Sequence, residues 1–267
     1  MTVYTVIGGG GFVGSQVVAH LRALGHEPFL PARDDPSLWH RDLGRLFYCA
    51  GLTGDYRTRP FAAVEAHVGL FARLVERARF ERVVYLSSTR LYDSQAGDLG
   101  HENRPISIDA ADPAHLYELS KLLGENLALH QSQGRGVVAR LSYVFGWDAR
   151  AEGFLSQWLR SAAMSRSLRI DSSPGSARDY IHVADVSAAL HALLDSSLNE
   201  IVNVARGETI DNARIAELFA RHGRTVEFTR ADDTAPAKAL DVTRLAALGA
   251  PARPVLPLID AYLAGLI

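Results

Sequence analysis

The chain has very little cysteine, no long apolar run and no surplus of charge of either sign. Its 267 residues include a single cysteine, Cys49, so an internal disulfide cannot form and a reducing compartment is expected. Cys49 lies in an apolar run, which favours a buried, inert thiol over a nucleophile. The formal net charge of −2 gives no indication of binding to nucleic acid or to a membrane surface.

Targeting, membrane and metal signals are missing as well. The sequence begins on an apolar, β-branched segment, and no apolar run reaches the ~18 residues that a membrane span needs. It has no HExxH motif and no paired cysteines, so no metal site is expected. The composition, with 48% hydrophobic and 22% charged residues, is ordinary for a globular protein. We therefore expect a cytoplasmic protein with no membrane or nucleic-acid partner.

The most informative motif is a glycine-rich turn near the start of the sequence. A β-branched strand over residues 3–7 enters the pattern Gly8-x-x-Gly11-x-x-Gly14, after which apolar residues recur at helical spacing. This order places backbone N–H groups and the positive end of a helix dipole where a pyrophosphate can bind. The residues predicted to bind a dinucleotide here are Gly8, Gly11, Phe12, Val13 and Gly14.

The segment after the second expected strand, 27–32, bears on the choice of dinucleotide. An NAD-selecting carboxylate is expected at the end of that strand, about 20 residues beyond the glycines. Ala32 holds this position and Arg33 follows it, and a guanidinium suits a 2′-phosphate. NADP(H) is therefore favoured over NAD(H), although a one-residue shift would bring Asp34 to the ribose. The other alternative is that Arg33, Asp34 and Asp35 form a solvated turn that caps a helix. Two prolines favour an edge strand here.

Strands and helices alternate along most of the remaining chain. Apolar runs end in Ala50-Gly51 and in Ser87-Ser88-Thr89, and helical spacing follows over 61–79 and from residue 115. The expected later strands cover 46–50, 82–89, 137–141 and 178–182. This βα alternation predicts an α/β fold with a Rossmann-type, doubly wound parallel sheet and a small C-terminal substrate-binding region. Ala50 and Gly51 are predicted to face the cofactor.

A tyrosine and a lysine follow the hydroxyl residues that end the strand over 82–89. Residues just beyond the carboxyl end of a parallel strand face the ligand crevice. Tyr117 and Lys121 are four positions apart and therefore lie on one face of a helix. A lysine ammonium beside a tyrosine favours the phenolate, so a lowered pKa is predicted for Tyr117. The Tyr-x-x-x-Lys spacing is common by itself and gains its meaning from the neighbouring motifs.

In this order the motifs resemble those of the extended short-chain dehydrogenase/reductase family, which contains nucleotide-sugar epimerases, dehydratases and ketoreductases. The resemblance covers nearly the whole chain. It rests on the glycine turn, Ser87-Ser88-Thr89-Arg90-Leu91-Tyr92, Tyr117-x-x-Ser120-Lys121 with Glu125, and the stretches 140–146, 178–186 and 202–204. It implies a catalytic triad of Ser88, Tyr117 and Lys121. Ser88 is preferred because it precedes Tyr92 by four residues, and Ser87 and Thr89 remain second choices.

The resemblance also implies roles for these residues. Tyr117 would exchange a proton with the reacting oxygen, Ser88 would hydrogen-bond that oxygen, and Lys121 would hold the nicotinamide ribose. Arg178 occupies a position that often contacts the diphosphate of a nucleotide sugar, the alternative being an ion pair with Asp179 or Asp185.

Departures from the family pattern limit the reaction and the pocket. The resemblance implies that Thr89 and Ser142 bind the substrate. Thr89 and Arg90 stand where the dehydratases carry Asp-Glu, which argues against dehydration, and His67-Val68 stands where Asn-Val is frequent. The chain is also shorter than most members after the second strand and in its C-terminal part, which favours a more open pocket or a smaller ligand.

The expected organisation is a dinucleotide-binding domain over 1–145 plus about 176–200, and a substrate-binding region over about 146–175 and 201–267. In the latter, Trp158 is expected in the core and a closing helix over 258–267. The expected function is NAD(P)-dependent 4-keto reduction or 4-epimerisation of a nucleotide-activated sugar. The alternatives are reduction of a non-sugar carbonyl compound and non-catalytic redox sensing. The resemblance also implies a homodimer formed through the helices that contain Phe71 and Leu123.

Overall fold

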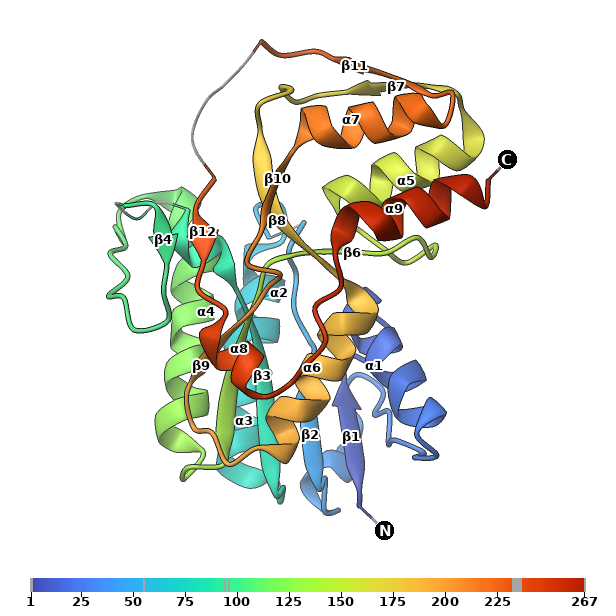
Figure 1. Ribbon diagram of the computed structural model, residues 1–267. Coiled ribbons are helices and arrows are strands. Elements are labelled where there is room, and N and C mark those ends of the chain that lie inside the picture. The colour runs from blue at the N-terminus through green and yellow to red at the C-terminus, as the bar shows by residue number, and fades with distance from the viewer. Residues whose placement is uncertain (1, 55, 94, 96, 232–236, 267) are drawn as a thin grey trace.

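The computed structural model describes residues 2–54, 56–93, 95, 97–231 and 237–266. Its centre is a five-stranded parallel sheet in the order β1-β2-β3-β5-β9 (Figure 1). These strands are β1 (Tyr4–Ile7), β2 (Arg45–Tyr48), β3 (Arg82–Ser88), β5 (Gly136–Leu141) and β9 (Ile201–Val204). They are short and almost wholly buried, as expected for parallel strands that are covered on both faces. The predicted α/β Rossmann-type class is confirmed.

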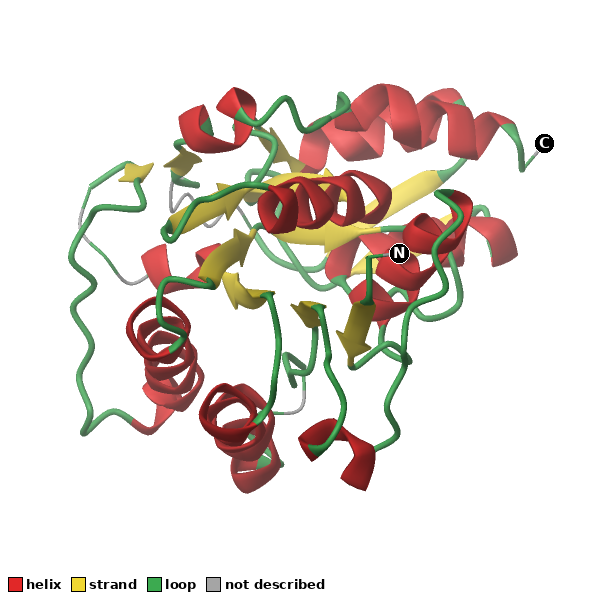
Figure 2. Ribbon diagram, turned by 90° about the horizontal axis from the view of Figure 1, so that it is seen from below, coloured by secondary structure: helices red, strands yellow, loops and turns green. Residues whose placement is uncertain are grey.

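Helices cover both faces of this sheet (Figure 2). On one face, α1 (Phe12–Ala23) and α6 (Val183–Asp195) share a hydrophobic core with the strands. On the other face, α3 (Leu70–Arg77) and the segment after α4 (Leu116–Asn126) pack against the strands in a second core. The short helix α8 (Thr243–Ala247) adds Leu245 to the first core.

The helix predicted over 61–79 forms with an irregular centre. α2 (Pro60–Val64) passes into a π-helical segment over Glu65–Gly69, and α3 continues from it. A second π-helical segment, Leu127–Gln131, follows α4. A π turn adds a residue and shifts the buried face, so Ala63 and His67 are buried while the apolar Val64 is 38% exposed, and the apolar spacing gave no sign of this.

The strand expected over 27–32 is reduced to a single bridge at the edge of the sheet. Phe29 N donates to Tyr4 O at 2.8 Å, and Val6 N donates to Phe29 O at 3.0 Å. Pro28 and Pro31 flank this bridge and have no N–H group to extend it. The connection to β2 is short, as predicted, and contains a 3₁₀ turn over Pro36–Trp39.

A smaller region lies beyond the carboxyl ends of the central strands (Figure 1). In it, β8 (Ala177–His182) pairs with β6 (Tyr143–Phe145) in parallel and with β10 (Thr209–Asp211) in antiparallel, and β7 (Ser167–Ile170) pairs with β11 (Thr225–Phe228). Helices α5 (Phe154–Met164), α7 (Asn212–Arg221) and α9 (Val255–Ala264) share one core with these strands. β4 (Leu99–Gly100) pairs with β12 (Ala239–Leu240).

The observed elements differ from the predicted organisation at several points. β8 lies in the smaller sheet although its following helix α6 packs on the central one, and β9 joins the central sheet. The central sheet is parallel throughout, as predicted, whereas the strand predicted over 178–182 pairs as β8 with the antiparallel β10 of the smaller sheet, because hydrophobic patterning does not specify which sheet a strand joins. Trp158 is 1% exposed and lies in the core, as predicted. The closing helix starts three residues earlier than predicted, and Ile267 lies outside the described residues.

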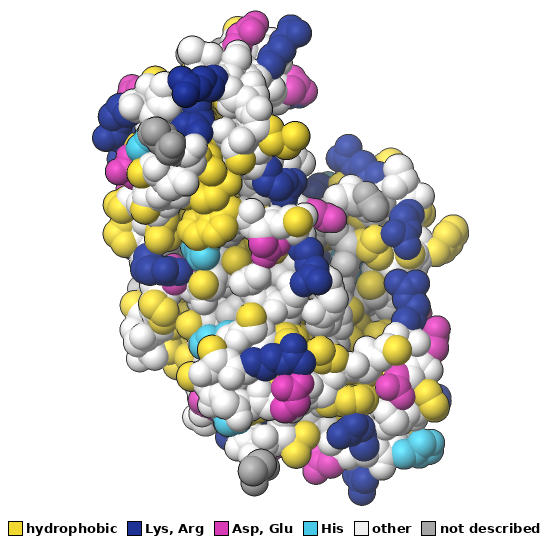
Figure 3. All heavy atoms as spheres, turned by 90° about the vertical axis from the view of Figure 1, so that its right-hand side faces the viewer, with side chains coloured by type: hydrophobic (Ala, Val, Ile, Leu, Met, Phe, Trp, Pro, Cys, Tyr) yellow, Lys and Arg dark blue, Asp and Glu magenta, His cyan; other side chains and the backbone are white. Residues whose placement is uncertain are grey.

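Charged side chains of both signs are scattered over the face shown in Figure 3 instead of gathering into one patch. Within the described part of the chain, no helix is long and apolar enough to cross a membrane.

Candidate active site

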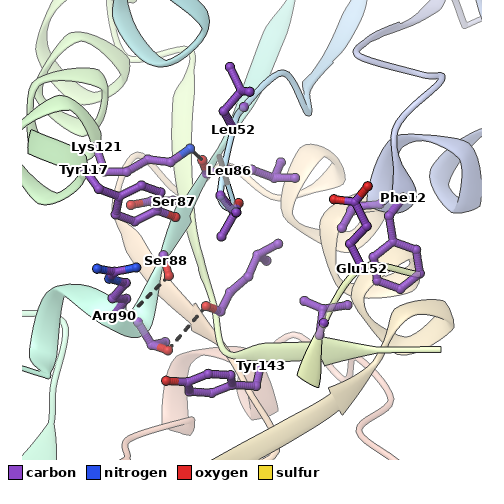
Figure 4. A pocket seen from close by; sticks show the side chains of 18 of the residues that line it. Phe12, Leu52, Leu86, Ser87, Ser88, Arg90, Tyr117, Lys121, Tyr143 and Glu152 are labelled. Carbon is purple, nitrogen blue, oxygen red and sulfur yellow. Dashed lines mark hydrogen bonds between the residues drawn. The ribbon is translucent and has the colours of Figure 1, made fainter. Parts of the chain in front are cut away.

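A cavity of about 1070 Å³ opens at the carboxyl ends of the central strands. Its walls come from the glycine turn after β1, residues 49–54 after β2, residues 86–90 at the end of β3, and residues 141–144 after β5. Tyr117 and Lys121 reach it from α4, and residues 152–155 and 157 close it from the start of α5. Figure 4 places Tyr117, Ser88 and Arg90 together on one side, with Phe12 and Glu152 across from them. This is the edge of an open α/β sheet where ligands bind.

The glycine turn and the start of α1 line the cavity through Gly11, Phe12, Val13 and Gly14. Gly8 has φ +80° and its carbonyl accepts Gly11 N at 3.0 Å, which closes the turn behind the cavity wall. A Cβ on Gly14 would lie 2.2 Å from Gly8 O, so only glycine fits there. α1 begins at Phe12 with neither a side-chain cap nor an acidic residue in its first turn. Its unshared N–H groups and helix dipole therefore fit the diphosphate of a dinucleotide.

Gly14→Ala is expected to destabilise the protein by about 1–3 kcal/mol, because the new methyl group overlaps the Gly8 carbonyl. Gly10→Ala is the matched control, since a Cβ at Gly10 meets no atom within 4 Å and its backbone does not need glycine. Urea unfolding of both variants measures the difference. Equal stabilities would contradict the close approach of α1 to the turn.

The other predicted cofactor residues fall into two groups. Ala50 and Gly51 line the cavity next to Cys49, whose thiol pKa is raised to about 12 by burial, so the thiol stays protonated. Arg33 lies on an exposed turn beyond Phe29, and Asp34 beside it has φ 64°. Arg33 is not among the described residues that line the cavity.

Tyr117 lies in the first turn of α4 with only 2% of its surface exposed. Burial raises its pKa, while hydrogen bonds with Ser88 and Thr53 and the charge of Arg90 act to lower it. The predicted lowering of the Tyr117 pKa is therefore wrong in direction. Lys121 Nζ lies 5.9 Å from the Tyr117 ring centroid and donates to Leu86 O at 2.9 Å, so it does not offset the burial of the phenol.

The three hydroxyl residues at the end of β3 have different partners. Ser87 Oγ donates to Glu125 Oε1 at 2.6 Å, and Thr89 Oγ1 donates to Leu141 O at 3.3 Å. Ser88 Oγ accepts Arg90 N at 3.2 Å and hydrogen-bonds Tyr117. Ser88 is thus the hydroxyl that contacts the Tyr117 phenol.

Sequence reasoning missed a charged pair beside Tyr117. The Arg90 guanidinium lies 5.1 Å from the Tyr117 ring centroid, its Nε donates to Glu118 Oε1 at 2.9 Å, and its Nη2 donates to Tyr56 Oη at 2.7 Å. Glu118 is 5% exposed and lines the cavity, and its Oε2 has no hydrogen-bond partner among the described residues. The sequence places Arg90 two residues after Ser88 and Glu118 directly after Tyr117, but it does not indicate that the two side chains pair.

The predicted substrate residues are divided between two adjoining cavities. Thr89 and Ser142 line the main one. Arg178 lines a neighbouring cavity of about 160 Å³, which shares Thr89 and Tyr143 with the first. Its guanidinium lies 5.3 Å from the Tyr143 ring centroid, and its Nη1 is buried without a hydrogen-bond partner in the described structure.

The alternative ion pairs of Arg178 do not form. Asp179 accepts the backbone N–H groups of residues 206–208, and Asp185 binds Arg253 with its Oδ1 2.7 Å from Arg253 Nε. Burial raises the pKa of Asp179 to about 6. No group of three His, Cys, Asp or Glu side chains among the described residues is arranged to hold a metal ion.

Comparisons with known proteins agree with this arrangement. The profile of the NAD dependent epimerase/dehydratase family matches residues 46–205. The dTDP-4-dehydro-6-deoxy-D-allose reductase of Streptomyces bikiniensis is 28% identical over 173 residues, which are 61% of this chain and 53% of that protein. A protein of the same name from Streptomyces sp is also 28% identical, over 174 residues. The chain therefore spans about half the length of the curated relatives it matches.

Solved structures resemble the chain over almost its whole length. MoeE5 in complex with UDP-glucose and NAD superposes with a TM-score of 0.80 at 23% identity, covering 99% of this chain and 98% of that one. RMD from Pseudomonas aeruginosa complexed with NADPH gives a TM-score of 0.77 at 21% identity, covering 99% of each chain. At these identities the likeness shows the fold.

Proposed function

Because this chain belongs to the NAD dependent epimerase/dehydratase family, we propose that it is an NAD(P)-dependent oxidoreductase or epimerase of a nucleotide-activated sugar. The reaction is reduction of a 4-keto group or epimerisation at C4, with Tyr117 as the acid/base. The observation that carries this proposal is the contact of Ser88 with the buried Tyr117 phenol in a cavity that also holds Lys121 and the glycine turn.

The residues around the cavity suit a bound dinucleotide. Gly11–Gly14 would hold its diphosphate, Ala50 and Gly51 would lie along its middle, and Lys121 would bind the nicotinamide ribose. When bound, the dinucleotide supplies or accepts a hydride. NADP(H) is proposed over NAD(H) because Ala32 leaves no carboxylate for the ribose and Arg33 offers a cation on the following turn.

The proton chemistry follows from the environment of Tyr117. With its pKa raised by burial, the phenol is protonated at neutral pH and acts as the acid when a carbonyl is reduced. Ser88 Oγ donates a second hydrogen bond to the same substrate oxygen, and the Lys121 charge favours the phenolate left behind. In the oxidative direction of an epimerase, the same phenolate takes the proton back.

Two features favour a nucleotide sugar over a non-sugar carbonyl compound. Arg178 presents an unpartnered guanidinium nitrogen beside the main cavity, and an arginine fork suits a diphosphate. Arg90 and Glu118 place a donor group and a free carboxylate oxygen on the cavity wall near Tyr117, a pair that suits sugar hydroxyls. A non-catalytic redox sensor would have no use for Ser88 and Lys121 beside Tyr117.

The proposed function is tested by incubating the purified chain with NADPH or NADH and a dTDP-4-keto-6-deoxy sugar. We expect oxidation of the dinucleotide, faster with NADPH, and a reduced sugar product. A UDP-hexose incubated with NAD reveals a C4 epimerase instead, by net conversion without loss of cofactor. Binding of a dinucleotide with no turnover of these sugars or of simple aldehydes and ketones would support the sensor and contradict the enzyme.

We also propose a homodimer. The predicted interface uses the helices that contain Phe71 and Leu123, and Phe71 itself is fully buried within its own chain. Phe61 on α2 and Leu123 on α4 are 88% and 51% exposed, and these helices lie side by side. An apolar face of this kind favours association. Sedimentation that finds only monomers at micromolar concentration would exclude the dimer.

A further inference from the structure

His67 is a buried polar residue that the proposed mechanism does not use. It lies at the centre of the π-helical segment Glu65–Gly69 and has no exposed surface. Its ring meets the Tyr117 ring edge-on, with centroids 5.4 Å apart. A Cβ on Gly51 would lie 3.5 Å from both His67 Nε2 and Lys121 Nζ. His67 therefore stands between the turn after β2 and the helix that carries Tyr117 and Lys121.

Both ring nitrogens of His67 have partners, and the partners determine the tautomer. Leu52 N donates to Nε2 at 3.2 Å, so Nε2 carries no hydrogen. Ser120 Oγ donates to Tyr117 O at 2.8 Å and accepts a hydrogen bond from Nδ1–H across 2.8 Å. The result is one directed chain of hydrogen bonds, from the Leu52 amide through His67 and Ser120 to the backbone of Tyr117.

The backbone of His67 is fixed as well as its ring. Tyrosine hydroxyls bind two backbone carbonyl groups of the π turn. Tyr85 Oη donates to His67 O at 3.0 Å, and Tyr48 Oη donates to Ala66 O at 2.6 Å. Burial and the nearby Lys121 charge lower the pKa of His67 to about 3, so the ring stays neutral at working pH. A protonated ring could not accept the Leu52 amide.

We propose that His67 is a positioning residue that holds the turn Gly51–Leu52 in register with the α4 segment carrying Tyr117. The hydrogen bond at Nε2 fixes the turn that lines the cofactor end of the cavity, and the hydrogen bond at Nδ1 fixes α4 through Ser120. The inference rests on the proposed function insofar as Gly51 lies against the dinucleotide.

Two substitutions each remove one of the two hydrogen bonds of the His67 ring and keep the other. The Asn amide has a donor group where Nδ1 lies and no atom where Nε2 lies. His67→Asn therefore keeps the hydrogen bond to Ser120 and loses the one from the Leu52 amide. The longer Gln side chain places its amide where Nε2 lies. His67→Gln therefore keeps the hydrogen bond from the Leu52 amide and loses the one to Ser120. His67→Asn is therefore expected to weaken dinucleotide binding by about tenfold with little change in kcat, and His67→Gln to lower kcat by about tenfold with an unchanged Kd.

The dinucleotide Kd is measured by NADPH fluorescence in the absence of sugar, and kcat is measured from NADPH oxidation at saturating keto sugar. Ser120→Ala provides a second variant that leaves the histidine in place, and it is expected to behave like His67→Gln. Should the wild type bind neither dinucleotide, the proposed function fails and this inference with it. Should the wild type bind and turn over while all three variants change Kd and kcat in equal proportion, or change neither, the positioning role alone is overturned.

Discussion

Tyr117→Phe is expected to lower the kcat for keto-sugar reduction by about a thousandfold, within the range that a positioned acid contributes. The change removes one hydroxyl from a buried ring that keeps its contacts with Tyr56 and His67. The fold and the cavity should therefore be intact, and the Kd for the dinucleotide should change by less than about threefold, because only the hydrogen bonds of the hydroxyl with Ser88 and Thr53 are lost. Stopped-flow reduction and fluorescence titration measure the two quantities.

The pH dependence of the wild type supplies an independent readout of the same site. Burial lowers the pKa of Lys121 to about 8, so the ammonium is present below pH 8 and is lost as the pH rises through that value. The Tyr117 phenol, whose pKa is raised, stays protonated over the same range. The kcat/KM for the dinucleotide in the reductive direction should thus be level up to about pH 7 and fall above pH 8. A profile that rises there, or full activity of Tyr117→Phe, would contradict the assigned roles.

The parts of the fold that could be predicted from the sequence are those in which one pattern has one structural solution. A β-branched run before glycines and a helical pattern has few alternatives, so β1, the turn and α1 follow directly. The segment around Phe29 has strand residues but too few N–H groups, and its single bridge depends on where Tyr4 and Val6 lie. Which sheet takes β8 or β9 depends on contacts between segments far apart in the chain, and local patterning does not encode them.

The candidate site divides in the same way. Tyr117 and Lys121 share a helix face because of their spacing, and both line one cavity with Ser88. The direction of the Tyr117 pKa depends on burial and on where the Lys121 amine finds its acceptor, which is the Leu86 carbonyl. Glu118 could be found only from the structure, because helical spacing alone does not say that Arg90 reaches it.

Glu125 and Arg140 form a buried ion pair behind the candidate site. Glu125 is 3% exposed and Arg140 is 2% exposed, and the guanidinium makes two hydrogen bonds to the carboxylate, at 2.8 and 2.7 Å. Ser87 adds a third at 2.6 Å, and Arg140 Nη1 donates to Tyr92 Oη at 2.8 Å. The pair therefore connects α4 to β3 and β5, the elements that hold Tyr117 and Ser88.

Glu125→Ala is expected to destabilise the protein by about 3–5 kcal/mol, because it leaves the Arg140 charge buried without its counter-ion. A loss of this size corresponds to a fall in Tm of roughly 6–20 °C for a chain of this length. Calorimetry measures it, with Glu27→Ala as the control: that variant breaks an ion pair whose side chains are 52% and 74% exposed, and its Tm should not move.

A second replacement tests whether the unpaired Arg140 charge causes the loss of stability in Glu125→Ala. Glu125→Leu combined with Arg140→Met removes both charges and leaves apolar side chains of similar volume, so most of the lost stability should return. Ser87 and Tyr92 each lose a partner in the double variant, so a residual cost of about 1–2 kcal/mol is expected. If Glu125→Ala unfolds within a degree or two of the wild type, the pair does not hold α4 against the sheet. If the double variant is no more stable than Glu125→Ala, the unpaired Arg140 charge does not account for the destabilisation.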